Sequence, residues 1–142
     1  MNEMITKMRH VGIIVKDMDK SVESFKNLFG LKDADIRQLS ADDTGGAGRF
    51  AFIPVGGTEL ELIQPVADYF IEMLGNHGTA GINHVAFVVT DIEEMVRMMA
   101  EKGIRLGHIT KEGIMDAGQM RIAYLDPEDT DGILIELVQP AS

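Results

Sequence analysis

The sequence predicts an α+β protein in which one βαβββ module occurs twice and contributes to a mixed sheet. Residues 9–17 (RHVGIIVKD) reappear as residues 83–91 (NHVAFVVTD), and residues 59–65 (ELELIQP) reappear as residues 134–140 (LIELVQP). Between these segments, each copy has one stretch with helical apolar spacing and further stretches with strand character. We therefore expect a single domain over residues 1–142, with a partly open, barrel-like sheet.

The elements follow the same order in both copies. Module one spans about 8–65, a linker helix about 66–75, and module two about 82–140. In module one, Asp17 or Asp19 is expected to cap a helix that stops at Gly30. In module two, Asp91 and Glu94 resemble a capping box for a helix that ends at Gly103. The expected helices are 19–29 and the stretch from 92 to Gly103, and the expected strands are 10–15, 34–39, 49–54, 59–64, 84–89, 105–110, 119–125 and 133–139.

Side-chain alternation along the strands predicts which residues share a face. His10 alternates with Val11, Ile13 and Val15, and His84 alternates in the same way with Val85, Phe87 and Val89. We expect the apolar triplets to lie under the helices and both histidines to lie on the opposite face. The two glutamates of the repeat stand in strongly apolar runs such as LIELV, where an unpaired carboxylate would be costly to bury.

The repeat therefore supplies two imidazoles and two carboxylates at matching positions. This set suits a borderline divalent ion, Zn, Co, Ni or Mn, inside the sheet. For any one of these residues alone, a core histidine or a strand-edge glutamate is the simpler interpretation. The matching positions of all four favour a metal site. The expected ligands are His10, Glu61, His84 and Glu136.

Composition limits the class of partner. The 142 residues carry 13 basic and 23 acidic side chains, a formal net charge of −10, which argues against nucleic acid. No apolar run reaches membrane-spanning length and the start lacks a signal-peptide core, so we expect a cytoplasmic protein without a membrane partner. Without cysteine, thiolate ligands and disulfides are excluded. The exposed edges of a small sheet favour a homodimer.

The segments GTELELIQP, GTAGINHVAFVVTDIEE and RIAYLDPEDTDGILIELV carry a resemblance to a known family. Through them, nearly the whole chain resembles the vicinal oxygen chelate superfamily, which includes glyoxalases, bleomycin resistance proteins and dioxygenases. Within it, the chain looks most like the methylmalonyl-CoA epimerases. The resemblance implies the same four metal ligands and homodimers. It also implies a metal-dependent isomerase that abstracts a proton α to a carbonyl of a CoA or other thioester, through a metal-bound enediolate.

Two alternatives remain open at this stage. The same ligand set also fits a glyoxalase-I-like lyase of the lactoylglutathione lyase type, because glyoxalases place Glu where epimerases often have Gln. A third interpretation is a non-catalytic protein that binds a small molecule or an antibiotic.

The catalytic base is where the resemblance weakens. Epimerases carry a catalytic Glu at a place that falls near Gly45, inside the loop ADDTGGAG (41–48), where this chain has none. The candidates for the base are Asp43, close by in that loop, and the ligand carboxylates Glu61 and Glu136. A solvated loop is the simpler interpretation of Asp43.

A second departure concerns substrate contacts. The acidic turn DPEDTDG (126–132) replaces the HPK common in epimerases and removes a cation. Gln119, Arg121 and Arg49 are the candidate substrate contacts. His77 and His108, which have no counterpart in the repeat, are expected at the surface.

Overall fold

Two compact units make up the chain, here a computed structural model that describes residues 4–75 and 78–141. Unit 1 comprises Met1–His10 and His84–Ser142, and unit 2 comprises Val11–Asn83. The strands are hydrogen-bonded in the order β2-β3-β4-β1-β5-β8-β7-β6. Because β5 pairs with β8 in parallel whereas β3 pairs with β4 and β7 with β8 antiparallel, the sheet is mixed. It is not closed, and the predicted α+β class is confirmed.

Unit 2 contains the helix and strands of module one. Its α1 begins where the Asp17 carboxylate accepts a hydrogen bond from the Lys20 N–H (3.2 Å). The helix ends at Gly30, whose φ of 65° is the left-handed conformation that glycine adopts without steric cost. The elements are β1 (Ile5–Ile14, begun in unit 1), α1 (Met18–Phe29), β2 (Arg37–Leu39), β3 (Gly48–Val55), β4 (Thr58–Pro65) and α2 (Asp68–Leu74).

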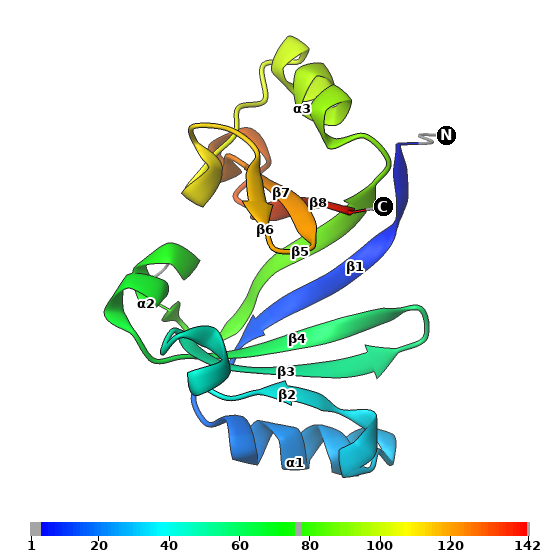
Figure 1. The fold of residues 1–142 in the computed structure, drawn as a ribbon, viewed down its shortest axis with the longest axis vertical. Helices are drawn as coiled ribbons and strands as arrows, with labels where there is room; N and C mark the ends of the chain where they lie inside the picture. Colours follow the sequence, from blue (N-terminus) through cyan, green and yellow to red (C-terminus); the bar gives the residue numbers. More distant parts are fainter. Residues whose placement is uncertain (1–3, 76–77, 142) are drawn as a thin grey trace. The chain divides into compact units, whose positions relative to one another are not determined.

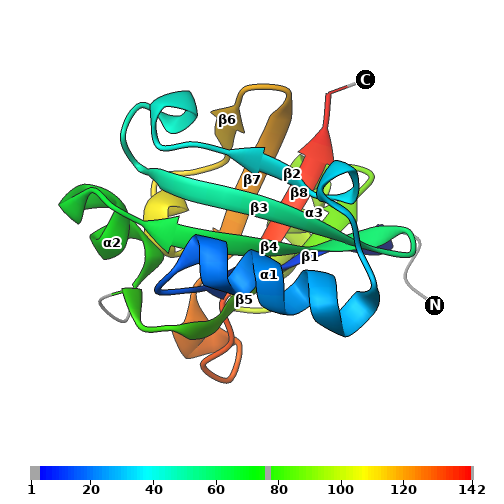
Figure 2. The same cartoon turned by 90° about the horizontal axis from the view of Figure 1, so that it is seen from below.

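The core of unit 2 lies on both faces of its strands. Met18 and Val22 of α1 pack on Ala51, Ile53 and Leu62 of β3 and β4, and Ile13 and Val15 border this cluster, as strand alternation predicts. Figure 2 shows α1 running in roughly the same direction as β3 and β4. The other face is covered by α2, whose Leu74 packs with Ile14 and Ile63.

Unit 1 repeats the arrangement with module two and the first half of β1. The Asp91 carboxylate accepts from the Glu94 N–H (3.1 Å) and starts α3, whose Ile92 and Met95 pack on Val89, Ala123 and Leu137. Figure 1 shows α3 and the strands of this unit. The elements are β5 (Gly81–Val89, begun in unit 2), α3 (Ile92–Glu101), β6 (Met115–Ala117), β7 (Met120–Leu125) and β8 (Ile135–Pro140).

Helix length bears on the predicted absence of a membrane partner. Within residues 4–75 and 78–141, no helix is long and apolar enough to cross a bilayer.

One connection between helix and sheet is repeated in both modules. The Gln64 side chain accepts a hydrogen bond from the Met18 N–H (2.7 Å), and Gln139 accepts the equivalent bond from the Ile92 N–H (2.8 Å). Each bond satisfies a backbone donor at the start of a helix, which has no partner within the helix.

An arginine stands opposite each of these glutamines in the register and reaches the same helix. Arg49, opposite Gln64, pairs with Asp19 on α1 (2.8 Å). Arg121, opposite Gln139, pairs with Glu93 on α3 (2.9 Å). Each helix is thus attached to its strands by a glutamine and an arginine.

The predicted strand at 105–110 is wrong. Only Leu106 forms a bridge there, to Leu125, and residues His108–Thr110 form a 3-10 turn. The reason is packing: Gly107 lies so close to β7 that an added Cβ would be 2.7 Å from the Asp126 Cα. The edge strand of module two is β6 instead, joined to β7 by a two-residue turn at 118–119. In module one, the strand predicted at 34–39 is reduced to Arg37–Leu39 by a 3-10 turn at Asp33–Asp35.

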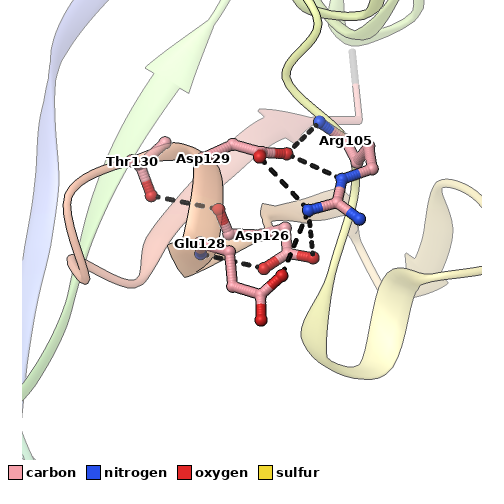
Figure 3. A network of polar contacts seen from close by, with 5 residues as sticks. All are labelled: Arg105, Asp126, Glu128, Asp129 and Thr130. Atoms are coloured by element: carbon pink, nitrogen blue, oxygen red, sulfur yellow. Dashed lines mark hydrogen bonds and ion pairs between the residues drawn. The ribbon is translucent and has the colours of Figure 1, made fainter.

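The acidic turn at 126–132 pairs with a basic residue of unit 1. Arg105 donates to Asp129 (3.0 Å) and Glu128 (3.2 Å) and lies 3.7 Å from Asp126. Figure 3 shows the three carboxylates gathered around this one guanidinium. These ion pairs hold the pKa of the Asp129 carboxyl below its usual range, mainly through the Arg105 side chain. The acidic turn, which departs from the HPK pattern, is therefore paired with Arg105.

Candidate metal centre

Three buried side chains of unit 1 converge on one point. His10 lies on β1, His84 on β5 and Glu136 on β8. The two Nε2 atoms are 3.0 Å apart, and the Glu136 Oε1 lies 3.3 Å from His10 Nε2 and 3.5 Å from His84 Nε2. The strands explain the convergence, because β5 pairs with β8 and places Ala86 opposite Glu136, two residues from His84.

The spacing of these three atoms fits a shared divalent ion. Ligand atoms that bind one ion at about 2.1 Å lie roughly 3.0–3.4 Å apart in octahedral or tetrahedral geometry. Two imidazole nitrogens and one carboxylate oxygen are the donor set that borderline ions prefer. The residues are 7%, 5% and 6% exposed, in the order His10, His84 and Glu136, so a positive charge among them would offset the cost of burying the carboxylate.

Burial also sets the charge state of the site. It lowers the pKa of His84 from 6.5 to about 4, and the nearby Glu136 carboxylate only partly opposes this. His84 is therefore neutral at physiological pH. A neutral imidazole has a lone pair available, which is the form that binds a metal ion.

Glu61, the fourth expected ligand, belongs to unit 2. It lies on β4 opposite Phe52 and is half-buried. Its neighbours Leu60 and Leu62 pack in the cluster under α1, so the Glu61 side chain points to the strand face opposite that helix. In unit 1, Ile135 and Leu137 pack under α3, so the Glu136 side chain points to the strand face opposite that helix. The alternation predicted for the two glutamates is confirmed, whereas the role of Glu61 as a ligand stays a prediction.

Asp43, a candidate base, is an exposed residue with a local structural role. Its carboxylate accepts hydrogen bonds from the Ser40 N–H (2.7 Å) and hydroxyl (3.0 Å), and the Ser40 hydroxyl accepts from the Asp43 N–H (3.2 Å). The Ser40 backbone bond is the main reason that the pKa of Asp43 lies below its ordinary value. A carboxylate of lowered pKa is a weak proton acceptor, so this geometry does not favour Asp43 as the base.

The three expected substrate contacts lie in different environments. Arg49 and Arg121 are paired with helix carboxylates, as described above, and Arg121 also lies 3.5 Å from Asp116. Gln119 is exposed in the turn between β6 and β7, and its carbonyl accepts from the Ala141 N–H (2.7 Å). Sequence reasoning missed the structural role of both arginines. The sequence feature that could have revealed this role is the glutamine that recurs in IQP and VQP. Each arginine stands opposite one of these glutamines.

Two aromatic side chains near the cluster were also missed. The Tyr124 ring meets the His84 ring edge-on, with centroids 6.1 Å apart, and the His108 ring meets Tyr124 at 4.8 Å. His108 is half-buried, so its predicted surface position is wrong. His108 has no counterpart in the repeat, which is why the pattern gave no signal. His77 lies outside the described residues.

Comparison with known proteins places the chain among relatives of similar length and fold. The family model of the glyoxalase/bleomycin resistance protein/dioxygenase superfamily matches residues 9–124. An ethylmalonyl-CoA/methylmalonyl-CoA epimerase of Cereibacter sphaeroides is 27% identical over 139 residues, covering 96% of this chain and 99% of the relative.

A solved structure and a second kind of enzyme extend the comparison. The crystal structure of methylmalonyl-CoA epimerase from Mycobacterium tuberculosis superposes with a TM-score of 0.76 at 28% identity, covering 100% of this chain and 93% of that one. A lactoylglutathione lyase of Arabidopsis thaliana is 26% identical over 92% of this chain, which spans 43% of that lyase. By its sequence match and its fold, the chain belongs to the glyoxalase/bleomycin resistance protein/dioxygenase superfamily.

Proposed function

We propose that this protein is a metal-dependent epimerase that exchanges the proton on the carbon next to the carbonyl of an acyl-CoA thioester. The convergence of His10, His84 and Glu136 carries the proposal. A buried set of two imidazoles and one carboxylate has the chemistry of an ion site. Its location on three strands of one unit gives it the rigidity that a catalytic ion needs.

In the proposed site, His10, His84 and Glu136 of unit 1 would hold the ion, and the role of Glu61 as a fourth ligand stays a prediction. Bound there, a Zn, Co, Ni or Mn ion would supply a Lewis acid for a carbonyl oxygen. His10 and His84 would each donate an imidazole nitrogen lone pair, and Glu136 would bring a negative charge that balances the ion. The apolar residues beside Glu136, Ile135 and Leu137, pack under α3 and fix the strand that presents the carboxylate.

The substrate class is inferred from the relatives. The Cereibacter and Mycobacterium relatives are named as epimerases of malonyl-type CoA esters, and this chain matches them along nearly its whole length. The proton on the carbon next to a thioester carbonyl is acidic enough to be removed by a side chain when the developing oxyanion is stabilised. We therefore infer a 2-substituted acyl-CoA as substrate, bound by a homodimer.

Deuterium exchange tests the proposal. Purified protein loaded with Zn, Co, Ni or Mn in turn is incubated with methylmalonyl-CoA in D2O, and label at the α-carbon is followed by NMR or mass spectrometry. The expected result is exchange and epimerisation that stop when a chelator removes the ion and return when the ion is restored. Exchange that is absent with every ion, or that is unaffected by the chelator, would contradict the proposal.

A glyoxalase-type lyase is the second candidate, favoured by the match to the Arabidopsis lactoylglutathione lyase. In that reaction, the proton removed from one carbon of the substrate is added to the neighbouring carbon. A predicted ligand carboxylate, Glu61 or Glu136, would transfer this proton. Conversion of the hemithioacetal of methylglyoxal and glutathione, without exchange in acyl-CoA, would favour the lyase. Tight binding of either compound without turnover would favour a binding protein.

A further inference from the structure

The backbone of His108 adopts a conformation that histidine rarely takes. Its φ is 54°, and in residues 4–75 and 78–141 only Asp131 shares a positive φ among residues other than glycine. This left-handed conformation is unfavourable for a side chain with a Cβ, and it persists where the surroundings impose it.

Thr110 and Gly107 fix this conformation from both sides. The Thr110 hydroxyl is buried, accepts from the Tyr124 N–H (2.8 Å) and lies within bonding distance of the Gly107 carbonyl (2.9 Å). The Gly107 N–H donates to the Tyr124 carbonyl (2.9 Å), and its Cα lies against the Asp126 backbone. His108 thus stands between two residues that are bonded to the same position of β7.

The ring of His108 is thereby placed on the face of the sheet that carries Glu136. Tyr124 and Glu136 are directly opposite in the β7–β8 register, so their side chains share a face with Cβ atoms roughly 5 Å apart. His108 packs edge-on against Tyr124 (4.8 Å), and Tyr124 packs edge-on against His84 (6.1 Å). Three rings therefore form a row that begins at His108 and ends at the candidate metal centre.

Burial, more than the charged groups nearby, governs the pKa of the His108 ring. Burial lowers this pKa, the Glu136 carboxylate on β8 raises it in part, and the Lys111 ammonium lowers it again. His84 on β5 is neutral at physiological pH, and Tyr124 on β7 presents its ring. A neutral imidazole has one nitrogen able to accept a proton, and half-exposure leaves it in contact with water.

We propose that His108 is a catalytic residue that accepts the substrate's α-proton and passes it to water, an inference that rests on the proposed function. The C–H bond breaks, and its electron pair becomes the C=C bond of an enolate whose negative charge lies on the thioester oxygen. The proton bonds to the free imidazole nitrogen of His108, giving an imidazolium. The imidazolium passes this proton to water, and water protonates the opposite face of the enolate, which inverts the carbon.

His108→Asn is the first test, because asparagine tolerates the left-handed backbone and has no basic nitrogen. The expected result is a fall of about 10²–10⁴-fold in kcat for exchange and epimerisation, with little change in KM. Metal content should stay at its wild-type value, because His108 is not one of the three residues whose ligand atoms converge. Tm should fall only slightly, through loss of the ring contact with Tyr124. The wild type should show a decline of kcat/KM at low pH as His108 becomes protonated, and the variant should not.

Two further variants separate chemistry from structure. His108→Gly, which also suits a φ of 54°, should regain exchange when imidazole is added to the solution. Asp131→Asn is the matched control, because Asp131 has a φ of 59° but is exposed in the turn before β8, and its kcat should equal that of the wild type.

The outcomes distinguish this inference from the function on which it rests. Wild-type exchange that persists in His108→Asn, or a His108→Gly variant that imidazole does not restore, overturns the role of His108 and leaves the epimerase proposal intact. A wild type that shows no metal-dependent exchange overturns both.

Discussion

Gln64 and Gln139 make the same hydrogen bond in the two modules, each accepting from the first backbone N–H of the helix that follows the histidine strand. The distances are 2.7 Å to Met18 and 2.8 Å to Ile92. The duplication therefore preserves the attachment of helix to sheet as well as the histidine and the glutamate. Conservation of this bond between the copies indicates that it matters for the stability of each unit.

Replacing Gln139 with Met should destabilise the protein by about 1–2 kcal/mol. The substitution keeps the length of the side chain but leaves the part-buried Ile92 N–H without its acceptor. Urea unfolding followed by circular dichroism measures the change. Gln38→Met, at an exposed position of β2, is the matched control and should have almost no effect. Equal stability of the two variants would show that the bond contributes nothing.

Arg49→Gln and Arg121→Gln test whether these arginines contact substrate. Because each already pairs with a helix carboxylate, we expect KM for the acyl-CoA to stay at its wild-type value in both variants. Stability should fall only slightly, as is usual for exposed ion pairs, and the loss should shrink at high salt. Steady-state kinetics and thermal unfolding provide the measurements. A tenfold rise in KM with unchanged unfolding would instead assign the arginine to the substrate site.

The metal-free protein should lose stability as the pH falls from 6.5 toward 4. His84 has a pKa of about 4 in the folded chain and an ordinary value of 6.5 when unfolded, so the unfolded chain binds the extra proton in this window. The stabilisation is complete above pH 6.5 and is lost on acidification, with a maximum of about 3 kcal/mol. The difference between wild type and His84→Gln, measured by urea unfolding at several pH values, isolates this residue. A difference that does not vary with pH would contradict the prediction.

Removing a ligand should abolish metal-induced stabilisation. Saturating ion at 100 times its Kd stabilises a folded protein by about 2.7 kcal/mol, and Glu136→Gln should eliminate most of this gain. Glu61→Gln should weaken it less, because Glu61 is not one of the three residues whose ligand atoms converge. Metal analysis after dialysis and thermal unfolding with and without Zn measure both effects. Wild-type metal content in Glu136→Gln would rule out the three-residue cluster as the site.

The parts of the fold that depend on local patterns could be predicted from the sequence. Asp17 and Asp91 start the helices as expected, and Gly30 ends the first one, because capping involves residues only a few positions apart. The alternation around Glu61 and Glu136 also predicted correctly which neighbours face the helices. Because the pattern occurs twice, a helix start or a strand alternation predicted in one module could be compared with the same feature in the other.

Features that depend on contacts distant in the sequence could not be predicted. The segment 105–110 has the composition of a strand, but the approach of Gly107 to Asp126 and the bonds of Thr110 to Tyr124 turn it into a 3-10 turn. The same contacts bury half of His108, which has no counterpart in module one. Arg49 and Arg121 resembled free cations in the sequence because their carboxylate partners lie 28 or more positions away.

The first strand decides where the chain can be divided. Its residues up to His10 belong with His84–Ser142, whereas Val11 onward belongs with the remainder of module one. The repeating segment of the sequence is thus not the segment that is compact. A fragment cut at the boundaries of either sequence repeat would therefore not contain one complete compact unit.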